Sequence, residues 1–382
     1  MRASVAGLAA VILTLAGCDQ DRVAGAGDAG RPACTSVAGT GAVTFTTDEG
    51  ASLAPTAGVL TGVKYTRGLV ALSGSTLLAA HAGTLLRSTD AGCSWTWAGT
   101  VPHSYVALVA ASPTLAYGYP EGSAGLYHVG ADGAVQNLAS PVQRVWGLAV
   151  RAGRPENLRV AGETGQIYES DDGGATWRSV GVPVPATLLY SVAFDPANWD
   201  HAVAGAANSG AWTTEDGGRS WSRAQIASST TQRNQNVFRL AVSPVDPDVV
   251  WAAGIDLAEE DRRSRSGRHA YLSRDRGRTF IPVLSESAES PSGGPVTIVN
   301  GFVMEPHPRD PLVLYFVFSA STGNYGTDIV RLDARSGTHS VRHNPYHDVS
   351  EITFAPGRPD VMYLGLGVEQ RCDPIACAGT VF

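Results

Sequence analysis

The sequence predicts an all-β protein, folded as a single β-propeller of seven four-stranded blades that closes between its N- and C-terminal strands. Three observations lead to this prediction. A short pattern of Asp, Gly and an aromatic residue recurs at intervals of about 40 to 60 residues, which suits one blade per copy. Pairs of short apolar runs separated by Pro/Asp turns precede the pattern. No helical period of useful length follows the N-terminal segment.

The chain begins with an expected export signal. Arg2 precedes an apolar run at residues 5–15, which is too short to anchor stably across a bilayer, so residues 1–17 are predicted to be a signal peptide. Leu15-Ala16-Gly17-Cys18 resembles the bacterial lipobox, which implies cleavage before Cys18 and acylation of that cysteine. An ordinary signal peptide with a chance cysteine is the alternative. The lipid would anchor the protein at the periplasmic side of the inner membrane or at the outer membrane.

Residues 18–41 are rich in Gly, Ala and Asp and show no periodicity, as expected of a flexible tether. Residues 42–382 are predicted to form the propeller. The net charge of -7 leaves no basic stripe for nucleic-acid phosphates, so nucleic acid is not an expected partner.

Four segments share the pattern S/T-x-D-x-G-x-T/S-W/F. It resembles the Asp box of sialidases and other bacterial-neuraminidase-repeat propellers. Weaker copies centre on Asp48, Asp132 and Asp333, which gives seven units. The defining residues of the four strong copies are Ser88, Asp90, Gly92 and Trp95; Ser170, Asp172, Gly174 and Trp177; Thr214, Asp216, Gly218 and Trp221; and Ser273, Asp275, Gly277 and Phe280.

The chemistry expected of this motif is structural. Asp and Ser/Thr side chains bond backbone groups of a tight turn, Gly supplies a positive φ, and the aromatic residue packs between blades. The D-x-G triplet also resembles part of a calcium-binding loop, but the other ligand positions and the terminal Glu are missing. Neither a metal nor a cofactor is therefore expected.

Closure of the ring is expected across the termini. Two-strand units occur at residues 190–206, 238–254, 301–318 and 349–367, and the last of them is followed by no box. Residues 42–53 are expected to supply the missing outer strand or strands of the final blade, because pairing removes exposed edges. Whether the termini contribute two strands each or one and three stays open.

The cysteines after Cys18 are Cys34, Cys93, Cys372 and Cys377, in a chain predicted to reach an oxidising compartment. A Cys372–Cys377 loop, or a bond from Cys34 to one of that pair, is favoured, with Cys93 left over or joined to Cys34. A zinc site is the minor alternative, because no His lies near the C-terminal cysteines.

Ligands are expected on the face opposite the boxes, where links into each first strand meet the loops between second and third strands. Tyr105 and Arg67 also lie near such entries. Packing of the inner ring is the alternative role for the aromatic residues. The candidates on this face are Tyr119, Glu121, Arg144, Trp146, Tyr190, Phe238, Arg239, Asp348 and Glu351.

The resemblance covers nearly all of the mature chain and includes both enzymes and binders: sialidases, xyloglucan-cleaving glycosidases, photosystem assembly factors and the sortilin luminal domain. A sialidase needs an arginine triad, for which Arg67, Arg144 and Arg239 are weak candidates, and usually an R-I-P motif, which is missing. The xyloglucanase relatives use two propellers. A membrane-anchored, non-catalytic scaffold that binds a protein, peptide or glycan is therefore predicted, with a glycoside hydrolase as the alternative.

Overall fold

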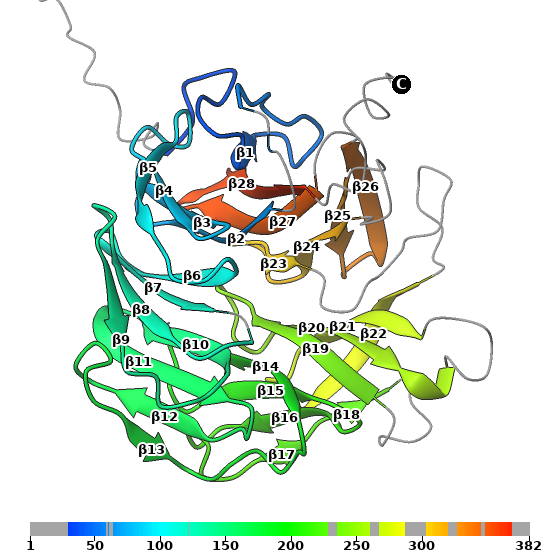
Figure 1. Cartoon of the computed structure of the whole chain (residues 1–382). Helices are drawn as coiled ribbons and strands as arrows, with labels where there is room; N and C mark the ends of the chain where they lie inside the picture. The colour runs from blue at the N-terminus through cyan, green and yellow to red at the C-terminus, as the bar shows by residue number, and fades with distance from the viewer. Residues whose placement is uncertain are drawn as a thin grey trace, which may run out of the picture.

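The computed structural model describes residues 30–58, 60, 64–120, 122–227, 235–259, 267–286, 303–319, 327–344 and 348–368. The all-β prediction is confirmed, because the regular structure of these residues is almost entirely β-strand. In Figure 1 the sheets stand around a common centre, as the blades of a propeller do.

Four sheets have four strands each, paired in sequence order and antiparallel. Their inner strands are near-continuous apolar runs, such as β15, which is buried at every position, because both faces of a blade pack against neighbouring blades. The strands are β6 (Val106–Ser112), β7 (Leu115–Pro120), β8 (Leu126–Gly130) and β9 (Val135–Leu138); β10 (Val145–Arg151), β11 (Arg154–Gly162), β12 (Ile167–Ser170) and β13 (Arg178–Val180); β14 (Leu189–Phe194), β15 (Ala202–Ala206), β16 (Gly210–Thr214) and β17 (Ser222–Arg223); and β23 (Met304–Pro306), β24 (Val313–Ser319), β25 (Thr327–Asp333) and β26 (Thr338–Asn344).

A fifth sheet has five strands in the order β18-β22-β21-β20-β19. Its bounds are β18 (Gln225–Ile226), β19 (Gln235–Val242), β20 (Val250–Asp256), β21 (Arg268–Ser273) and β22 (Thr279–Ser285). The short β18 comes directly after β17 of the preceding sheet and pairs in parallel with β22. The chain thereby ties two consecutive sheets together at their outer edges.

The sixth sheet has seven strands and contains both ends of the described chain. Its bounds are β1 (Val43–Thr46), β2 (Lys64–Ala71), β3 (Leu77–His81), β4 (Thr84–Ser88), β5 (Thr96–Thr100), β27 (Asp348–Ala355) and β28 (Arg358–Val368). The long β28 pairs antiparallel with β1, with β2 and with β27.

The prediction of seven four-stranded blades, with the last one closed between the termini, is wrong. Among the described residues, five sheets of four or five strands stand as separate blades, and the remaining strands share one seven-stranded sheet. The cause is the eleven-residue β28, whose hydrogen bonds reach β2 as well as β1 and β27. Strands that the sequence assigns to a first and a last blade are thus one sheet.

The four strong repeats form the same turn. In the first, Ser88 Oγ donates to Asp90 Oδ1 at 2.8 Å, and Gly92 N donates to Ser88 Oγ at 2.9 Å. Asp90 also accepts hydrogen bonds from the backbone and the hydroxyl of Ser94. Gly92 has a φ of 84°, which favours glycine. The equivalent bonds recur around Asp172, Asp216 and Asp275.

Of the three weaker copies, only the first forms this turn. Asp48 accepts from Thr46, from Ser52 N and from Ser52 Oγ, as the strong copies do. Asp132 accepts from Ala134 N, and Asp333 from Arg335 N, as in ordinary Asx turns. The copies at Asp132 and Asp333 lack a hydroxyl residue two positions before the aspartate, so the first bond of the motif has no donor.

The N-terminal segment is fixed to the box of β4 and β5. Cys34 and Cys93 form a disulfide, one of the pairings left open by the sequence, whereas Cys372 and Cys377 lie outside the described residues. Ala38 N donates to Cys93 O at 2.8 Å, and Trp95 N donates to Ala38 O at 3.0 Å. Residues 34–38, which the sequence assigns to the tether, therefore lie against the box end of this sheet.

The core consists of apolar clusters between neighbouring sheets. Val70 and Leu85 of one sheet, for example, pack with Val106 and Tyr127 of the next. Among the described residues, no helix is long and apolar enough to cross a membrane. The same residues contain no group of three or more His, Cys, Asp or Glu side chains that could hold a metal ion.

Candidate functional site

The strand registers define two ends of the ring. Ala71 at the end of β2 pairs with Leu77, and Leu77 pairs with Ser88, where the box begins. Thr66 at the start of β2 pairs with His81, beside the link from β3 to β4. The first strands therefore begin at the end opposite the boxes. This end, formed by the starts of β2, β6, β10, β14, β19 and β27, is called the entry face below.

Five of these first strands contain a β-bulge near their start. In each, one residue has no register partner on the second strand, because the pairing skips it. A bulge redirects a side chain out of the regular alternation and is common beside functional sites. The skipped residues are Arg67, Trp146, Tyr190, Phe238 and Ser350. Three of them, the aromatic ones, are residues that the sequence proposes for ligand contact.

Close packing of the inner strands makes glycine necessary after two of the bulges. A Cβ on Gly147 would lie 2.2 Å from Val192 O, and one on Gly68 would lie 2.4 Å from Val106 O. These carbonyls belong to the first strand of the next sheet. The first strands of adjacent sheets are thereby held close to one another near the entry face.

Two aromatic clusters result. In the first, the guanidinium carbon of Arg67 lies 5.4 Å from the ring centre of Tyr65 and 5.9 Å from that of Tyr105. Tyr105 is 45% exposed. In the second, the rings of Tyr190 and Phe238 are 4.9 Å apart, and both side chains are half-buried. Both clusters join residues of two consecutive sheets.

The remaining candidates of the entry face are not brought together into one constellation. Arg144 is exposed and pairs with Glu163 at 3.6 Å. Trp146 and Tyr119 are half-buried, as are Arg239, Asp348 and Glu351, which engage in other interactions. Glu121 lies outside the described residues. Among the candidates proposed from the sequence, the structure brings the aromatic side chains Tyr190 and Phe238 into contact.

Sequence reasoning missed Glu305 on β23. Burial raises the pKa of Glu305 to about 8, and the negative charge of Glu351 is the second, smaller cause. Glu305 is therefore protonated at neutral pH. Part of the Glu305 side chain is nevertheless accessible to solvent. The residue stands inside the apolar segment at 301–318, where a carboxylate is unexpected, and that position was the available signal.

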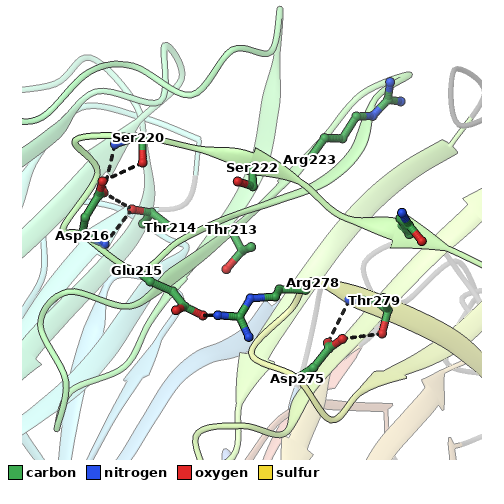
Figure 2. Close-up of a pocket in the computed structure, with 11 residues that line it drawn as sticks. Thr213, Thr214, Glu215, Asp216, Ser220, Ser222, Arg223, Asp275, Arg278 and Thr279 are labelled. Atoms are coloured by element: carbon green, nitrogen blue, oxygen red, sulfur yellow. Dashed lines mark hydrogen bonds and ion pairs between the residues drawn. The ribbon is translucent and has the colours of Figure 1, made fainter.

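A groove of about 520 Å³ lies at the opposite end, between the boxes of Asp216 and Asp275 (Figure 2). Its charged groups already have partners: Glu215 accepts from Arg278 at 2.5 Å, and Asp275 accepts from Thr279. The hydrogen bond from the Ser220 hydroxyl is the main reason why the pKa of Asp216 falls to about 2. The Glu215–Arg278 ion pair joins two consecutive sheets, and the bonds of Asp216 and Asp275 hold their own turns, so the groove is better suited to structure than to ligand binding.

Comparison with known proteins gives one close relative. The "Dispase autolysis-inducing protein" of Streptomyces mobaraensis is 42% identical over 340 residues, which are 88% of this chain and 89% of that protein. A family model described as sortilin, neurotensin receptor 3 (Sortilin-Vps10) matches residues 165–291.

Two solved structures show the same fold at low identity. YCF48 from Cyanidioschyzon merolae has a TM-score of 0.52 and 11% identity, covering 80% of this chain and 97% of that one. A structure titled "YCF48 bound to D1 peptide" has a TM-score of 0.50 and 13% identity, covering 81% and 94%. The relative and the fold together fit a non-catalytic propeller protein.

Proposed function

The chain belongs to the family of the dispase autolysis-inducing protein, and from this we propose that it is a non-catalytic propeller that binds a dispase-type protease and promotes its self-cleavage. The identity across nearly the full length of both chains carries the proposal. The relative's name describes an effect on a protease that cuts itself, so the chain need supply only binding. Binding would favour a conformation or an encounter of the protease in which its own peptide bonds become accessible.

The entry face is the proposed contact surface. Tyr190 and Phe238 present a paired aromatic surface next to Leu188, which is 39% exposed. Aromatic side chains held on a rigid frame are typical of the few residues that supply most of the energy in protein interfaces. The bulges of β14 and β19 fix both rings before a partner arrives, which lowers the entropy lost on binding.

The function can be tested with purified protein and dispase. The double variant Tyr190→Ala/Phe238→Ala is expected to slow the loss of intact dispase at least about tenfold relative to wild type, as removal of an aromatic hot spot does. The measurement is the rate at which dispase fragments appear on a denaturing gel. Trp97→Ala/Ile281→Ala removes two other exposed apolar side chains, 68% and 48% exposed, away from the entry face and serves as the matched control.

Two results would contradict the proposal. One is the absence of any effect of wild-type protein on dispase. The other is cleavage of catalytically inactivated dispase, because fragments could then come only from hydrolysis by this chain. A double variant that acts like wild type would leave the function standing but remove the entry face as its surface.

We also propose that the lipidated Cys18 anchors the protein with its entry face turned away from the membrane. Residues 19–29, which link Cys18 to the described part of the chain, lie outside the described residues. The next residue, Gly30, accepts a hydrogen bond from Tyr363 Oη at the box end, and Arg31 lies 3.9 Å from Asp360 at the same end. A chain that leaves from the box end would point that end toward the lipid.

Anchoring predicts a simple fractionation result. Cys18→Ser is expected to move the protein from the membrane pellet to the soluble fraction and to abolish labelling by a palmitate analogue, with an unchanged melting temperature. Wild-type protein that is already soluble and unlabelled would contradict the lipid anchor.

A further inference from the structure

We infer that Arg67, between Tyr65 and Tyr105, forms a receptor for a carboxylate side chain of the protein partner. This inference rests on the proposed function, since it names the chemistry that the partner offers to the entry face. Arg67 is a bulge residue of β2, and its guanidinium lies over both tyrosine rings. The site joins the seven-stranded sheet to the next one, because Tyr105 directly precedes β6.

The charge of Arg67 is not balanced within the described part of the protein. Other arginines there have acidic neighbours, such as Arg144 with Glu163 and Arg159 with Glu169. No ion pair to Arg67 is found among the described residues, although the whole chain has a net charge of -7. Its Nε atom is buried and has no hydrogen-bond partner. A buried donor without a partner is costly, so the guanidinium is under-satisfied before a partner arrives.

The surroundings hold Arg67 ready for such a group. The ring of Tyr65 packs closely on β28, where a Cβ on Gly367 would lie 2.4 Å from Tyr65 Cδ1. Stacking over aromatic faces restrains a guanidinium while its N–H donors stay directed within its own plane. A carboxylate that approaches in this plane can accept two parallel hydrogen bonds, which lysine cannot donate in the same geometry.

A second cation lies on the same strand, β2, and lines a separate cavity. Lys64, the sole lysine of the chain, is exposed and precedes Arg67 by three residues. It lines a cavity of about 360 Å³ together with Thr40, His81 and Thr84, and the described lining includes no carboxylate. Burial, and then the charge of Lys64, lower the pKa of His81 to about 4, so this imidazole is neutral at pH 7. An acidic segment of the partner that also reaches this cavity would meet the Lys64 cation and two threonine hydroxyls, and no carboxylate among the described lining residues would compete with it.

The test compares two charge-neutralising variants in binding to dispase and to a hexaglutamate peptide. Arg67→Gln is expected to weaken both affinities about tenfold or more, because a charge-assisted pair is lost. It should also flatten the dependence of log Kd on log salt concentration. Arg67→Lys is expected to lie between wild type and Arg67→Gln. Arg154→Gln, an exposed position on β11 at the box end, makes the same charge change and is expected to bind like wild type.

The outcomes separate this inference from the proposed function. If wild type binds hexaglutamate through Arg67 but does not bind dispase, the receptor stands and the protease partner is wrong. If wild type binds dispase and Arg67→Gln changes neither Kd nor its salt dependence, the carboxylate receptor is wrong and the proposed function stands. Equal losses of affinity in Arg67→Gln and Arg154→Gln would show that the effect comes from the change in net charge, and the inferred carboxylate receptor would then be wrong.

Discussion

Replacing Trp251 by alanine is expected to lower the free energy of unfolding by about 3–5 kcal/mol. The Trp251 side chain is 0% exposed and lies on β20, which pairs with β19 and β21 in the five-stranded sheet. It belongs to one apolar cluster with Leu314 and Phe316 of the next sheet. Its Nε1 donates to Pro311 O at 3.0 Å, so the variant leaves both a cavity and an unpaired carbonyl between two blades.

The matched control is Trp97→Ala, which removes the same side chain from β5, where it is 68% exposed. Its effect is expected to stay within about 0.5 kcal/mol. Urea unfolding followed by tryptophan fluorescence and by circular dichroism measures both variants. Similar losses at the two positions would contradict the view that packing between sheets supplies the stability.

The box motif predicted local structure better than it predicted packing. Its turn depends on bonds within a few residues, so the pattern around Asp90 or Asp172 is sufficient to specify it. The aromatic position of the motif is less uniform: Phe280 is 1% exposed, whereas Trp177 is half-buried and donates to Ala139 O. The fully buried Trp251 lies outside the motif, and no local pattern marks it.

The arrangement of blades could not be predicted from the sequence, because it depends on hydrogen bonds between segments that lie far apart along the chain. The spacing of the aspartates led us to count the weak copies at Asp132 and Asp333 as full repeat units. It could not show that β28 pairs with β2 as well as with β1. A strand register is set by packing across the sheet and by neighbouring strands, which a single sequence does not display.

The candidate site was predictable only in part. Entry into a first strand is recognisable from the apolar runs, and this located Trp146, Tyr190 and Phe238. The pairing of Tyr65 with Tyr105 across two sheets required the structure, because 40 residues separate them along the chain. The bulges themselves have no sequence signature here apart from the glycines that follow Arg67 and Trp146.

Glu305 makes the stability of the protein depend on pH. Its pKa is raised from 4.5 to about 8 in the folded state, by burial first and by Glu351 second. Between these two pH values the unfolded chain has released the proton and the folded chain has kept it. The free energy of unfolding therefore falls as pH rises from about 4.5 to about 8 and levels off above that.

Glu305→Gln is expected to remove this fall, because glutamine keeps the shape of the protonated acid without a titrating group. At about 1.4 kcal/mol per pKa unit, and with an allowance for the accessible part of the side chain, the variant should be more stable than wild type by roughly 2–4 kcal/mol at pH 8.5 and about equal at pH 4.5. Glu351→Gln should flatten the profile only in part, because it removes the second cause and leaves burial. Glu156→Gln, an exposed position, should follow wild type throughout. Urea midpoints measured from pH 4.5 to pH 9 decide the matter: parallel profiles for Glu305→Gln and wild type would show that Glu305 is ionised in the folded protein at neutral pH.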